Sequence, residues 1–328
     1  MSIVKTSMSE RLRYGLLYSL LTLTTICGVL VVPIPEVSTF ASLTLYFSAT
    51  LGYIGIGLLV WMYILGTRGV ASSLFEDYTK ITKIHGLLGK YGALLIFLHP
   101  ILICLNYGES LLYILVPQVG TSFENSVTLG KISLYILLVV WFTSAIIRGK
   151  IAYRPWKYLH YLAYITLPFA LLHIPNLGSS FMGYLAPKVF FYSVLITLLI
   201  FTLLRLRIFL NFDKASYIVA DHYELNPGIF ILRLLPKGTA LHTKLGQYIY
   251  LKMGYISEDH PFSVLHNDTA TGTISVAYRA HGRFTNELAK LQRGAKVFIG
   301  GPYGSFTHQI DAQSDRPIVF IAGGIGIT

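Results

Sequence analysis

The clearest pattern in the chain is a change from long apolar runs to short segments in which apolar and polar residues alternate. Crossing the ~30 Å hydrocarbon layer of a membrane takes about 20 apolar residues in a helix. Windows that meet this requirement occur only before Leu210. They predict six membrane-spanning helices, at Tyr14–Val32, Phe40–Leu65, Ile84–Leu105, Ile132–Ile147, Tyr158–Ile174 and Val189–Leu206.

From Asn211 onward the period changes to two, and Asn-Pro-Gly, Pro-Lys-Gly and Gly-Gly-Pro turns interrupt it. Such alternation with frequent Gly and Pro is typical of antiparallel β-structure. The expected strands include Ser216–Ala220, Ile229–Leu234, Gln247–Met253 and Thr273–Tyr278. The sequence therefore predicts an all-α six-helix membrane bundle followed by an antiparallel β-barrel domain.

Composition agrees with this division and excludes several classes of protein. The chain is 54% hydrophobic and only 12% charged, which excludes a disordered tail and an ordinary cytosolic enzyme. The formal net charge is +11, but the basic residues are not pooled in one block as a nucleic-acid binder requires. Cys27 and Cys104 both lie in apolar runs. Two such cysteines exclude a disulfide scaffold, a zinc ribbon and a Cys-ligated iron–sulfur cluster.

The basic residues mark one side of the predicted membrane domain. Loops on the cytoplasmic side of a membrane carry an excess of Lys and Arg. Here one side receives Lys5, Arg11, Arg13, Arg68, Lys80, Lys83, Arg148, Lys150, Arg154, Lys157 and Lys214. We therefore expect a multi-pass protein of the cell membrane with its N-terminus and β-rich domain in the cytoplasm. No small-residue cleavage site follows the first apolar run, so a retained helix is favoured over a signal peptide.

Four of the ten histidines fall inside predicted spans, where ionisable side chains are costly and usually functional. His85 and His99 lie in the third span, and His160 and His173 lie in the fifth. Both spans run in the same direction, so His85 can face His160 near the cytoplasmic end and His99 can face His173 near the other end. Two stacked bis-imidazole haem sites are predicted, with packing or a proton relay as alternatives. Zinc is disfavoured, because pairs about 20 Å apart cannot close one tetrahedral site.

The spacing of the histidines fits the two spans unequally. Fourteen residues from His85 to His99 correspond to about 21 Å on an ideal helix, with the rings about 40° apart. Thirteen residues from His160 to His173 leave the rings about 140° apart. Pro168 lies between them, and we expect it to kink or unwind the helix enough to correct this angle. An iron with both axial positions filled by imidazole has no open site and passes electrons.

Three motifs follow in the β-rich part. His260-Pro-Phe-Ser263 enters a strand and offers an aromatic ring and a hydroxyl. Gly282–Thr285 opens a predicted helix after Arg279 and suits a phosphate, although a simple Thr N-cap is the alternative. The apolar run Pro317–Ala322 leads into Gly323–Thr328, as a strand leads into the glycine-rich turn of a dinucleotide-binding fold.

Together these residues resemble the NADPH oxidase and ferric reductase superfamily, in which a six-helix domain with two haems is joined to a ferredoxin-reductase-like flavin and nicotinamide module. The resemblance covers nearly the whole chain. The unequal histidine spacing is more similar to NADPH oxidases than to fungal-type ferric reductases, and the short extracytoplasmic loops look prokaryotic. Eukaryotic oxidases carry an Arg near the outer haem in the second span, whereas residues 40–65 contain neither Arg nor Lys.

The resemblance implies two haems, expected to be b-type, with His85 and His160 at the inner one and His99 and His173 at the outer one. Candidates for the haem propionates are Lys90, Arg154 and Lys157, with snorkelling as the alternative for Lys90. The implied FAD site comprises His260, Pro261, Phe262, Ser263, Arg279, Gly282, Arg283, Phe284 and Thr285, with Phe262 in the ring-stacking position. The implied NAD(P)H site comprises Gly301, Gly323, Gly324, Gly326 and Thr328.

The resemblance also implies the domain boundaries and the activity. Residues 1–210 would form the transmembrane domain, 211–312 the FAD-binding barrel, and 313–328 the first strand and turn of an incomplete NAD(P)-binding domain. We expect a separate chain or a missing C-terminal domain to complete the NAD(P)H site, because this chain alone would bind NADPH poorly. The expected reaction carries electrons from cytoplasmic NAD(P)H through FAD and haem to O2, giving superoxide. The alternatives are a ferric or cupric reductase, a non-enzymatic haem conduit for a partner protein, and a transporter with incidental histidines.

Overall fold

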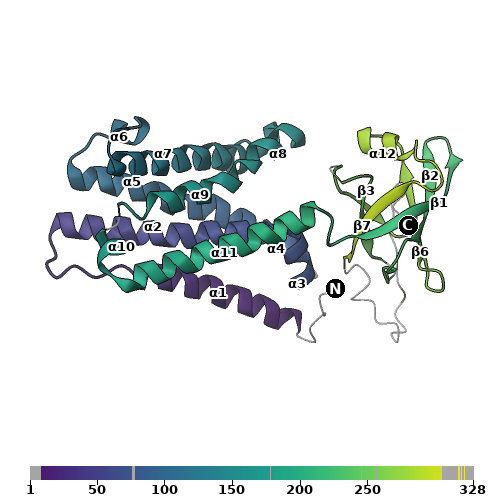
Figure 1. Cartoon of the computed structure of the whole chain (residues 1–328), viewed down its shortest axis with the longest axis horizontal. Coiled ribbons are helices and arrows are strands. Elements are labelled where there is room, and N and C mark those ends of the chain that lie inside the picture. The colour runs from purple at the N-terminus through teal and green to yellow at the C-terminus, as the bar shows by residue number, and fades with distance from the viewer. Residues whose placement is uncertain are drawn as a thin grey trace. The chain divides into compact units, whose positions relative to one another are not determined.

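The structure, a computed structural model, describes residues 9–75, 78–177, 179–244, 246–255, 257–304 and the single positions 317, 319 and 321. The chain divides into two compact units (Figure 1). One comprises Met1–Phe75 with Thr79–Thr202 and is helical. The other comprises Leu203–Thr328 with Glu76–Tyr78 and is built mainly on strands.

Long apolar helices make up the first unit. Among the described residues, five helices are long and apolar enough to cross a membrane: Glu10–Leu30, Phe40–Leu65, Tyr78–Tyr107, Ser122–Ile146 and Leu185–Phe209. These correspond to the first four and the sixth of the predicted spans. Three of these are single helices: α1 (Glu10–Leu30), α2 (Phe40–Leu65) and α11 (Leu185–Phe209). The third span consists of α4 (Tyr78–Leu87), the π-helix η1 (Leu88–Gly92) and α5 (Ala93–Tyr107). The fourth consists of α7 (Ser122–Trp141) and the π-helix η2 (Phe142–Ile146). Shorter helices are α3 (Arg68–Leu74), α6 (Leu112–Leu115), η3 (Arg148–Lys150) and α10 (Ser179–Gly183).

The remaining predicted span is helical but divided. It consists of α8 (Tyr153–Tyr161) and α9 (Ala163–His173), which meet at Leu162. At the division the Leu162 amide bonds to the Leu159 carbonyl and the Ile165 amide to the Leu162 carbonyl, so the turn is tighter than an α-helix. Because neither piece alone is long enough to cross a membrane, a sixth span remains a prediction.

The helix ends follow local chemistry in the sequence. Thr39 begins α2 with a capping box, in which Thr39 Oγ1 accepts from the Ser42 amide at 3.1 Å and Ser42 Oγ accepts from the Thr39 amide at 2.9 Å. Thr121 and Glu124 form the same motif at the start of α7. Since the first amides of a helix lack partners within it, these side chains fix where each helix begins.

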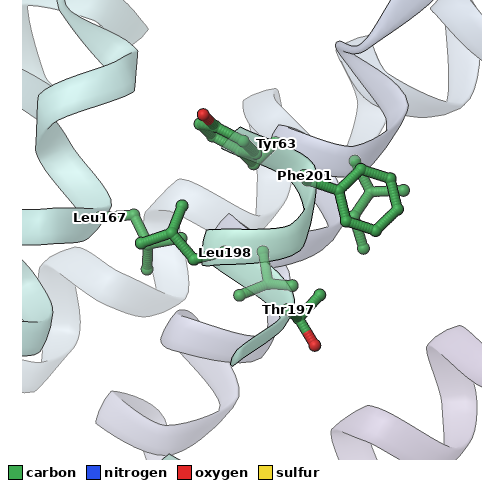
Figure 2. Close-up of a pocket in the computed structure, with 7 residues that line it drawn as sticks. Tyr63, Leu167, Thr197, Leu198 and Phe201 are labelled. Atoms are coloured by element: carbon green, nitrogen blue, oxygen red, sulfur yellow. The ribbon is translucent and has the colours of Figure 1, made fainter. Parts of the chain in front are cut away.

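The helices pack through apolar side chains. In the first unit α2 packs against α1 and α5, and α7 packs against α9 (Figure 1). Figure 2 shows side chains of α2, α9 and α11 meeting around a small depression, with Tyr63, Leu167 and Leu198 among them. The depression leaves no space for a water molecule. This junction is therefore a packed part of the helical core.

The second unit is an antiparallel sheet with strand order β4-β3-β7-β1-β2-β6-β5. Its strands are β1 (Ala215–Asn226), β2 (Ile229–Pro236), β3 (Tyr248–Lys252), β4 (His260–Ser263), β5 (His266–Asp268), β6 (Thr273–Arg279) and β7 (Lys296–Tyr303). The period-2 pattern predicted β1, β2, β3 and β6 within a few residues, except that β1 extends further to Asn226. Closure of the sheet into a barrel remains a prediction, because β4 and β5 are its edges among the described residues.

The core of this unit comes from alternate positions on the strands. Tyr217, Leu232, Ile249, Ile274 and Ile299 are completely buried, and each lies on a different strand. Burying one such side chain contributes about 1.5–3 kcal/mol to folding. The core holds β4 in place through Phe262, which pairs with Ile249 on β3.

Candidate functional site

The structure brings together the four membrane histidines in the two pairs expected from the sequence. His85 on α4 and His160 on α8 have ring centroids 6.1 Å apart, with ring planes at 68°. His99 on α5 and His173 at the end of α9 have centroids 6.4 Å apart, at 88°. The ideal-helix angles do not apply, because a π-helix, η1, separates His85 from His99 and a tight turn separates His160 from His173.

These separations fit an iron held between two imidazoles. A metal bound to one nitrogen of each ring at about 2 Å separates the two ring centres by about 6 Å. Direct edge-to-face packing of aromatic rings covers the same range of distances, so the spacing alone does not decide. The hydrogen bonds of the rings and the glycines beside them provide further evidence.

The outer histidines are oriented by backbone carbonyls. His99 Nδ1 lies 2.8 Å from the Ser48 carbonyl on α2, and His173 Nδ1 lies 2.9 Å from the Ser126 carbonyl on α7. A carbonyl only accepts hydrogen bonds, so Nδ1 carries the proton and donates it. The lone pair of Nε2 then remains for a metal, as in most metal-binding histidines.

Two glycines make room for these rings. A Cβ added to Gly130 on α7 would collide with the His173 ring, and one added to Gly52 on α2 would lie 3.3 Å from the His99 ring. Gly130 therefore requires a residue without a side chain, whereas a side chain at Gly52 would need a shift of a few tenths of an ångström. At both positions the helix approaches the histidine closely. The ring separations of both pairs fit two bis-imidazole haem sites. At the outer pair, the hydrogen bonds of the rings and the close approach of α2 and α7 to them agree with this.

The inner pair is oriented by side chains. His160 Nδ1 lies 3.1 Å from Ser144 Oγ on η2, and Trp156 Nε1 donates to the same oxygen at 3.1 Å. The Trp156 ring also stacks on His160, with centroids 4.9 Å apart and planes at 25°. Sequence reasoning missed Trp156, although its position four residues before His160 on one helix was a readable signal.

A basic residue outside the predicted set lies beside the inner pair. Arg148 places its guanidinium 4.3 Å from the centre of the Trp156 ring. Of the predicted propionate partners, Lys90 lies 5.2 Å from the Tyr91 ring and Lys157 lies 5.8 Å from the Tyr161 ring, whereas Arg154 is exposed. Arg148 is therefore linked to His160 through the ring of Trp156, and no motif in the sequence pointed to it.

Other candidate sites in the helical unit lack this chemistry. An apolar cleft of about 440 Å³ lies between α1, α2 and the α4–η1–α5 helix, and its lining contains none of the four histidines. Among the described residues, no three His, Cys, Asp or Glu side chains gather as a metal site would require. The paired imidazoles remain the feature that points to a bound metal.

In the second unit, the His260–Ser263 motif forms strand β4 and meets the Gly282–Thr285 segment. The His260 ring stacks on Phe284 of α12 (Arg283–Leu288), with centroids 3.8 Å apart and planes at 13°. Phe262 is only 8% exposed and packs against Tyr278, whose pKa is raised by burial. Phe262 thus belongs mainly to the core, while Pro261 and Ser263 are exposed.

The start of α12 is organised by a capping hydroxyl. Gly282 is the N-cap, and Thr285 Oγ1 accepts from the amides of His281 and Gly282, both at 3.0 Å. Thr285 is therefore the third helical residue instead of the N-cap that the alternative interpretation supposed. Arg283 at the start of the helix and Arg279 at the end of β6 are both exposed.

The nicotinamide motifs are described only in part. Gly301 lies in β7 with a positive φ of 131°, and a Cβ there would lie 3.3 Å from the Tyr303 ring. The predicted positions Gly323, Gly324, Gly326 and Thr328 lie outside the described residues.

Comparison with known families matches both units. Residues 51–171 match the family described as ferric reductase like transmembrane component. Residues 229–307 match the FAD-binding domain family. The chain belongs to the NADPH oxidase and ferric reductase superfamily. The first match contains His85, His99 and His160 and ends two residues before His173, and the second contains the predicted FAD-binding residues. The resemblance seen in the motifs is therefore confirmed.

Similar proteins match parts of the chain. A mitochondrial ferric reduction oxidase 8 of Arabidopsis thaliana is 26% identical over 61% of this chain and 27% of its own length. A probable dihydroorotate dehydrogenase B (NAD(+)) electron transfer subunit of Pyrococcus furiosus is 34% identical over 33% of this chain and 38% of its own. The flavohemoglobin of Malassezia yamatoensis, solved with FAD and haem, aligns with a TM-score of 0.31 at 16% identity, covering 84% of this chain and 67% of its own. The chain thus spans well under half the length of these two curated relatives.

Proposed function

We propose that this chain carries electrons across a membrane, from a flavin site on the β4–α12 side of the sheet to haems held by His85 with His160 and by His99 with His173. The observation that supports this best is the geometry of the two pairs, with ring centroids 6.1 and 6.4 Å apart. Two carbonyl acceptors at Nδ1 and two glycines against the outer rings strengthen it.

The residues around each site have defined tasks in this proposal. FAD and haem, when bound, supply the conversion between two-electron and one-electron transfer, because a nicotinamide delivers a hydride and haem accepts single electrons. Two imidazoles per site leave no open position on the metal and so prevent small molecules from binding there. Exposed Arg279 and Arg283 are the candidates for the flavin pyrophosphate, and Arg148 is the candidate for a propionate of the inner haem.

The donor and acceptor follow from the same proposal. Cytoplasmic NAD(P)H would donate, with Gly301 and the predicted glycines beyond the described residues contributing to the site. The printed name of the Pyrococcus relative includes NAD(+) for that protein. The acceptor would be O2, giving superoxide, or a ferric or cupric chelate, as the name of the Arabidopsis relative indicates for that protein. A haem conduit for a partner protein is the alternative without flavin chemistry.

An optical spectrum of the purified protein tests this proposal. We expect a low-spin haem Soret band and flavin absorbance, with about half of the haem lost in His85→Ala and about half in His99→Ala. His222→Ala is the control, since that histidine lies on β1 in the second unit. A Soret band that both membrane variants retain in full would overturn the proposal, and absent flavin absorbance would favour the haem conduit. Superoxide formation measured against reduction of chelated iron distinguishes the acceptors.

A further inference from the structure

Helix α11 ends in the second unit, and all four of its last carbonyls have hydrogen-bond partners. The last four carbonyls of a helix lack partners within it and are satisfied from outside. Three are satisfied by backbone amides that follow the helix: Leu210 bonds to Leu206 at 2.9 Å, Asn211 to Ile208 at 3.1 Å and Phe212 to Arg207 at 3.0 Å. Asn211 has a positive φ of 65°, which is the left-handed conformation of a Schellman cap.

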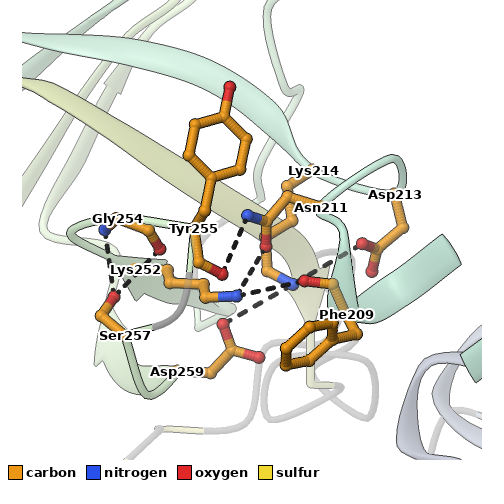
Figure 3. Close-up of polar contacts among 9 residues, drawn as sticks. All are labelled: Phe209, Asn211, Asp213, Lys214, Lys252, Gly254, Tyr255, Ser257 and Asp259. Atoms are coloured by element: carbon orange, nitrogen blue, oxygen red, sulfur yellow. Dashed lines mark hydrogen bonds and ion pairs between the residues drawn. The ribbon is translucent and has the colours of Figure 1, made fainter. Parts of the chain in front are cut away.

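The fourth carbonyl is satisfied by a strand far away in the sequence. Lys252 at the end of β3 places Nζ 3.5 Å from the Phe209 carbonyl and donates to Asn211 Oδ1 at 2.8 Å (Figure 3). The Asn211 amide in turn donates to the Tyr255 carbonyl at 3.5 Å. A positive charge at a helix C-terminus also interacts favourably with the helix dipole. The β3–β4 segment therefore completes the cap of α11.

This cap contains a buried charge. Lys252 is 5% exposed and Asn211 is 6% exposed, and burial lowers the pKa of the Lys252 ammonium. A buried ammonium is costly unless it is paired and hydrogen-bonded. Both of its hydrogen-bond acceptors lie at the end of α11, and the carboxylates of Asp259 and Asp213 also favour the charged form. The hydrogen-bonded part of the compensation therefore holds while the strand and the helix end stay together.

A second buried lysine links the same two segments. Lys214, whose side chain is 3% exposed, places Nζ 3.6 Å from Asp213 and 3.6 Å from Asp259 (Figure 3). Asp259 directly precedes His260, the first residue of β4. The linker between α11 and β1 is thus bound to the β3–β4 segment at two points, through Asn211 and through Lys214.

We propose that Lys252, with Asn211 and the Lys214–Asp259 ion pair, is a positioning device that fixes strand β4 to the end of the membrane helix α11. The flavin assigned to β4 would then keep a fixed position relative to the end of α11 within the second unit. The role in electron transfer, the functional part, rests on the proposed function. The attachment of β4 to the end of α11, the mechanical part, does not. Because electron transfer weakens steeply with distance, a loose β4 would slow transfer from flavin to haem.

Spin-label distances test the mechanical part without any cofactor. Labels at Leu203→Cys on α11 and Leu225→Cys on β1 occupy exposed positions, in a background of Cys27→Ser and Cys104→Ser. We expect a narrow distance distribution for the native lysine and a broader one for Lys252→Met, which keeps the length of the side chain without its charge. Lys290→Met, on an exposed ion pair, is the control and should leave the distribution narrow. Equal widths in all three proteins would overturn the proposal.

Transient kinetics test the functional part. In protein loaded with FAD and haem, light-driven reduction of FAD is followed by transfer of one electron, which reduces one ferric haem to ferrous. We expect this rate to fall several-fold in Lys252→Met and in Asn211→Gly, which keeps the left-handed backbone but loses the amide, and to recover in Lys252→Arg. FAD affinity and the haem spectrum should not change, because neither Lys252 nor Asn211 belongs to the predicted FAD site or to the histidine pairs. An unchanged rate would overturn the positioning role, whereas absence of transfer in the native protein would contradict the proposed function instead.

Discussion

The Nδ1 atoms of the membrane histidines have two kinds of partner. At the outer pair, the backbone carbonyls of Ser48 and Ser126 accept from His99 and His173, and the Ser48 hydroxyl also lies 3.0 Å from His99 Nδ1. At the inner pair, the partner of His160 is the hydroxyl of Ser144, which also accepts from Trp156. A hydrogen bond from Nδ1 makes an imidazole a stronger electron donor to its metal. The strength with which His160 donates electrons to a metal can therefore be changed by substituting Ser144.

We expect Ser144→Ala to raise the reduction potential of one haem and leave the other unchanged. Loss of the acceptor makes His160 a weaker donor, which disfavours the ferric state. A hydrogen bond worth about 1 kcal/mol corresponds to about 40 mV for one electron. A spectroelectrochemical titration resolves the two components.

Ser133→Ala is the matched control for that titration. Ser133 is also a buried helical serine, but its hydroxyl donates to the Thr166 carbonyl at 2.8 Å instead of contacting a histidine. We expect it to affect folding stability without moving either potential. Shifts in both components after Ser144→Ala would contradict the assignment of this hydroxyl to the inner site.

Alanine substitutions of the glycines beside the outer histidines should remove haem to different degrees. Gly130→Ala should displace the His173 ring and remove about half of the bound haem, since one of two sites is affected. Gly52→Ala should have a smaller effect, because its Cβ would lie 3.3 Å from His99, and Gly15→Ala should have none, as nothing lies within 4 Å of it. Haem content per chain is measured as the pyridine haemochrome. Equal haem content in all three variants would contradict the arrangement.

At the level of elements, the sequence predicted what local chemistry determines. The bounds of α2 were predicted at both ends, because a long apolar run follows the Thr39 cap and stops before Gly66. The strands β2 and β6 were predicted by their alternation. The π-helices η1 and η2 were not, since no residue preference marks them and they depend on neighbouring helices, as when Trp141 Nε1 donates to the Lys90 carbonyl at 3.0 Å.

The contact between β4 and α12 predicts a change in flavin affinity. Phe284→Leu removes the stack under His260, a contact worth about 1 kcal/mol, and we expect the dissociation constant of FAD to rise about fivefold. Fluorescence titration with FAD measures it. Phe230→Leu is the control, because Phe230 stacks on Tyr278 near His222 and should alter stability alone. Equal FAD affinity in native protein and Phe284→Leu would place the flavin elsewhere.

At the scale of the whole molecule, two basic residues that the charge pattern assigned to one side of the membrane contact neighbouring segments of the helical unit. Arg13 at the start of α1 donates to the Leu74 carbonyl at 3.0 Å, and Lys80 at the start of α4 lies 3.8 Å from the Tyr14 ring. The segments that the charge pattern assigned to one side of a membrane therefore contact one another. Which side this is follows from the charge pattern alone, since the excess of Lys and Arg predicts the cytoplasm.

Labelling of single cysteines tests this orientation. In a background of Cys27→Ser and Cys104→Ser, we expect a membrane-impermeant maleimide to label Ser110→Cys in intact cells. Lys150→Cys should be labelled only after the membrane is permeabilised, although both positions are exposed on the protein. The reverse pattern would place the second unit outside the cell.

Contacts between distant segments mark the limit of what the sequence could predict. His85 and His160 were paired because helix direction and membrane depth restrict their partners. Lys252 and Asn211 were not paired, because 41 residues separate them and only the folded sheet brings the end of β3 to the end of α11. Most residues beyond Gly304 lie outside the described part of the chain, so the expected nicotinamide domain stays a prediction.

The interval between His85 and His99 is longer when it is counted in residues than when it is counted in α-helical steps. A π-helical bond spans one residue more than an α-helical bond, so η1 stores one extra residue between His85 and His99. In α-helical steps, that interval of fourteen becomes thirteen, which equals the interval from His160 to His173. A chain with one residue deleted from Leu88–Gly92 would become a regular helix there and keep both histidines in place. With that residue set aside the two intervals are equal, so the unequal spacing of the histidines amounts to one extra residue in a single helix.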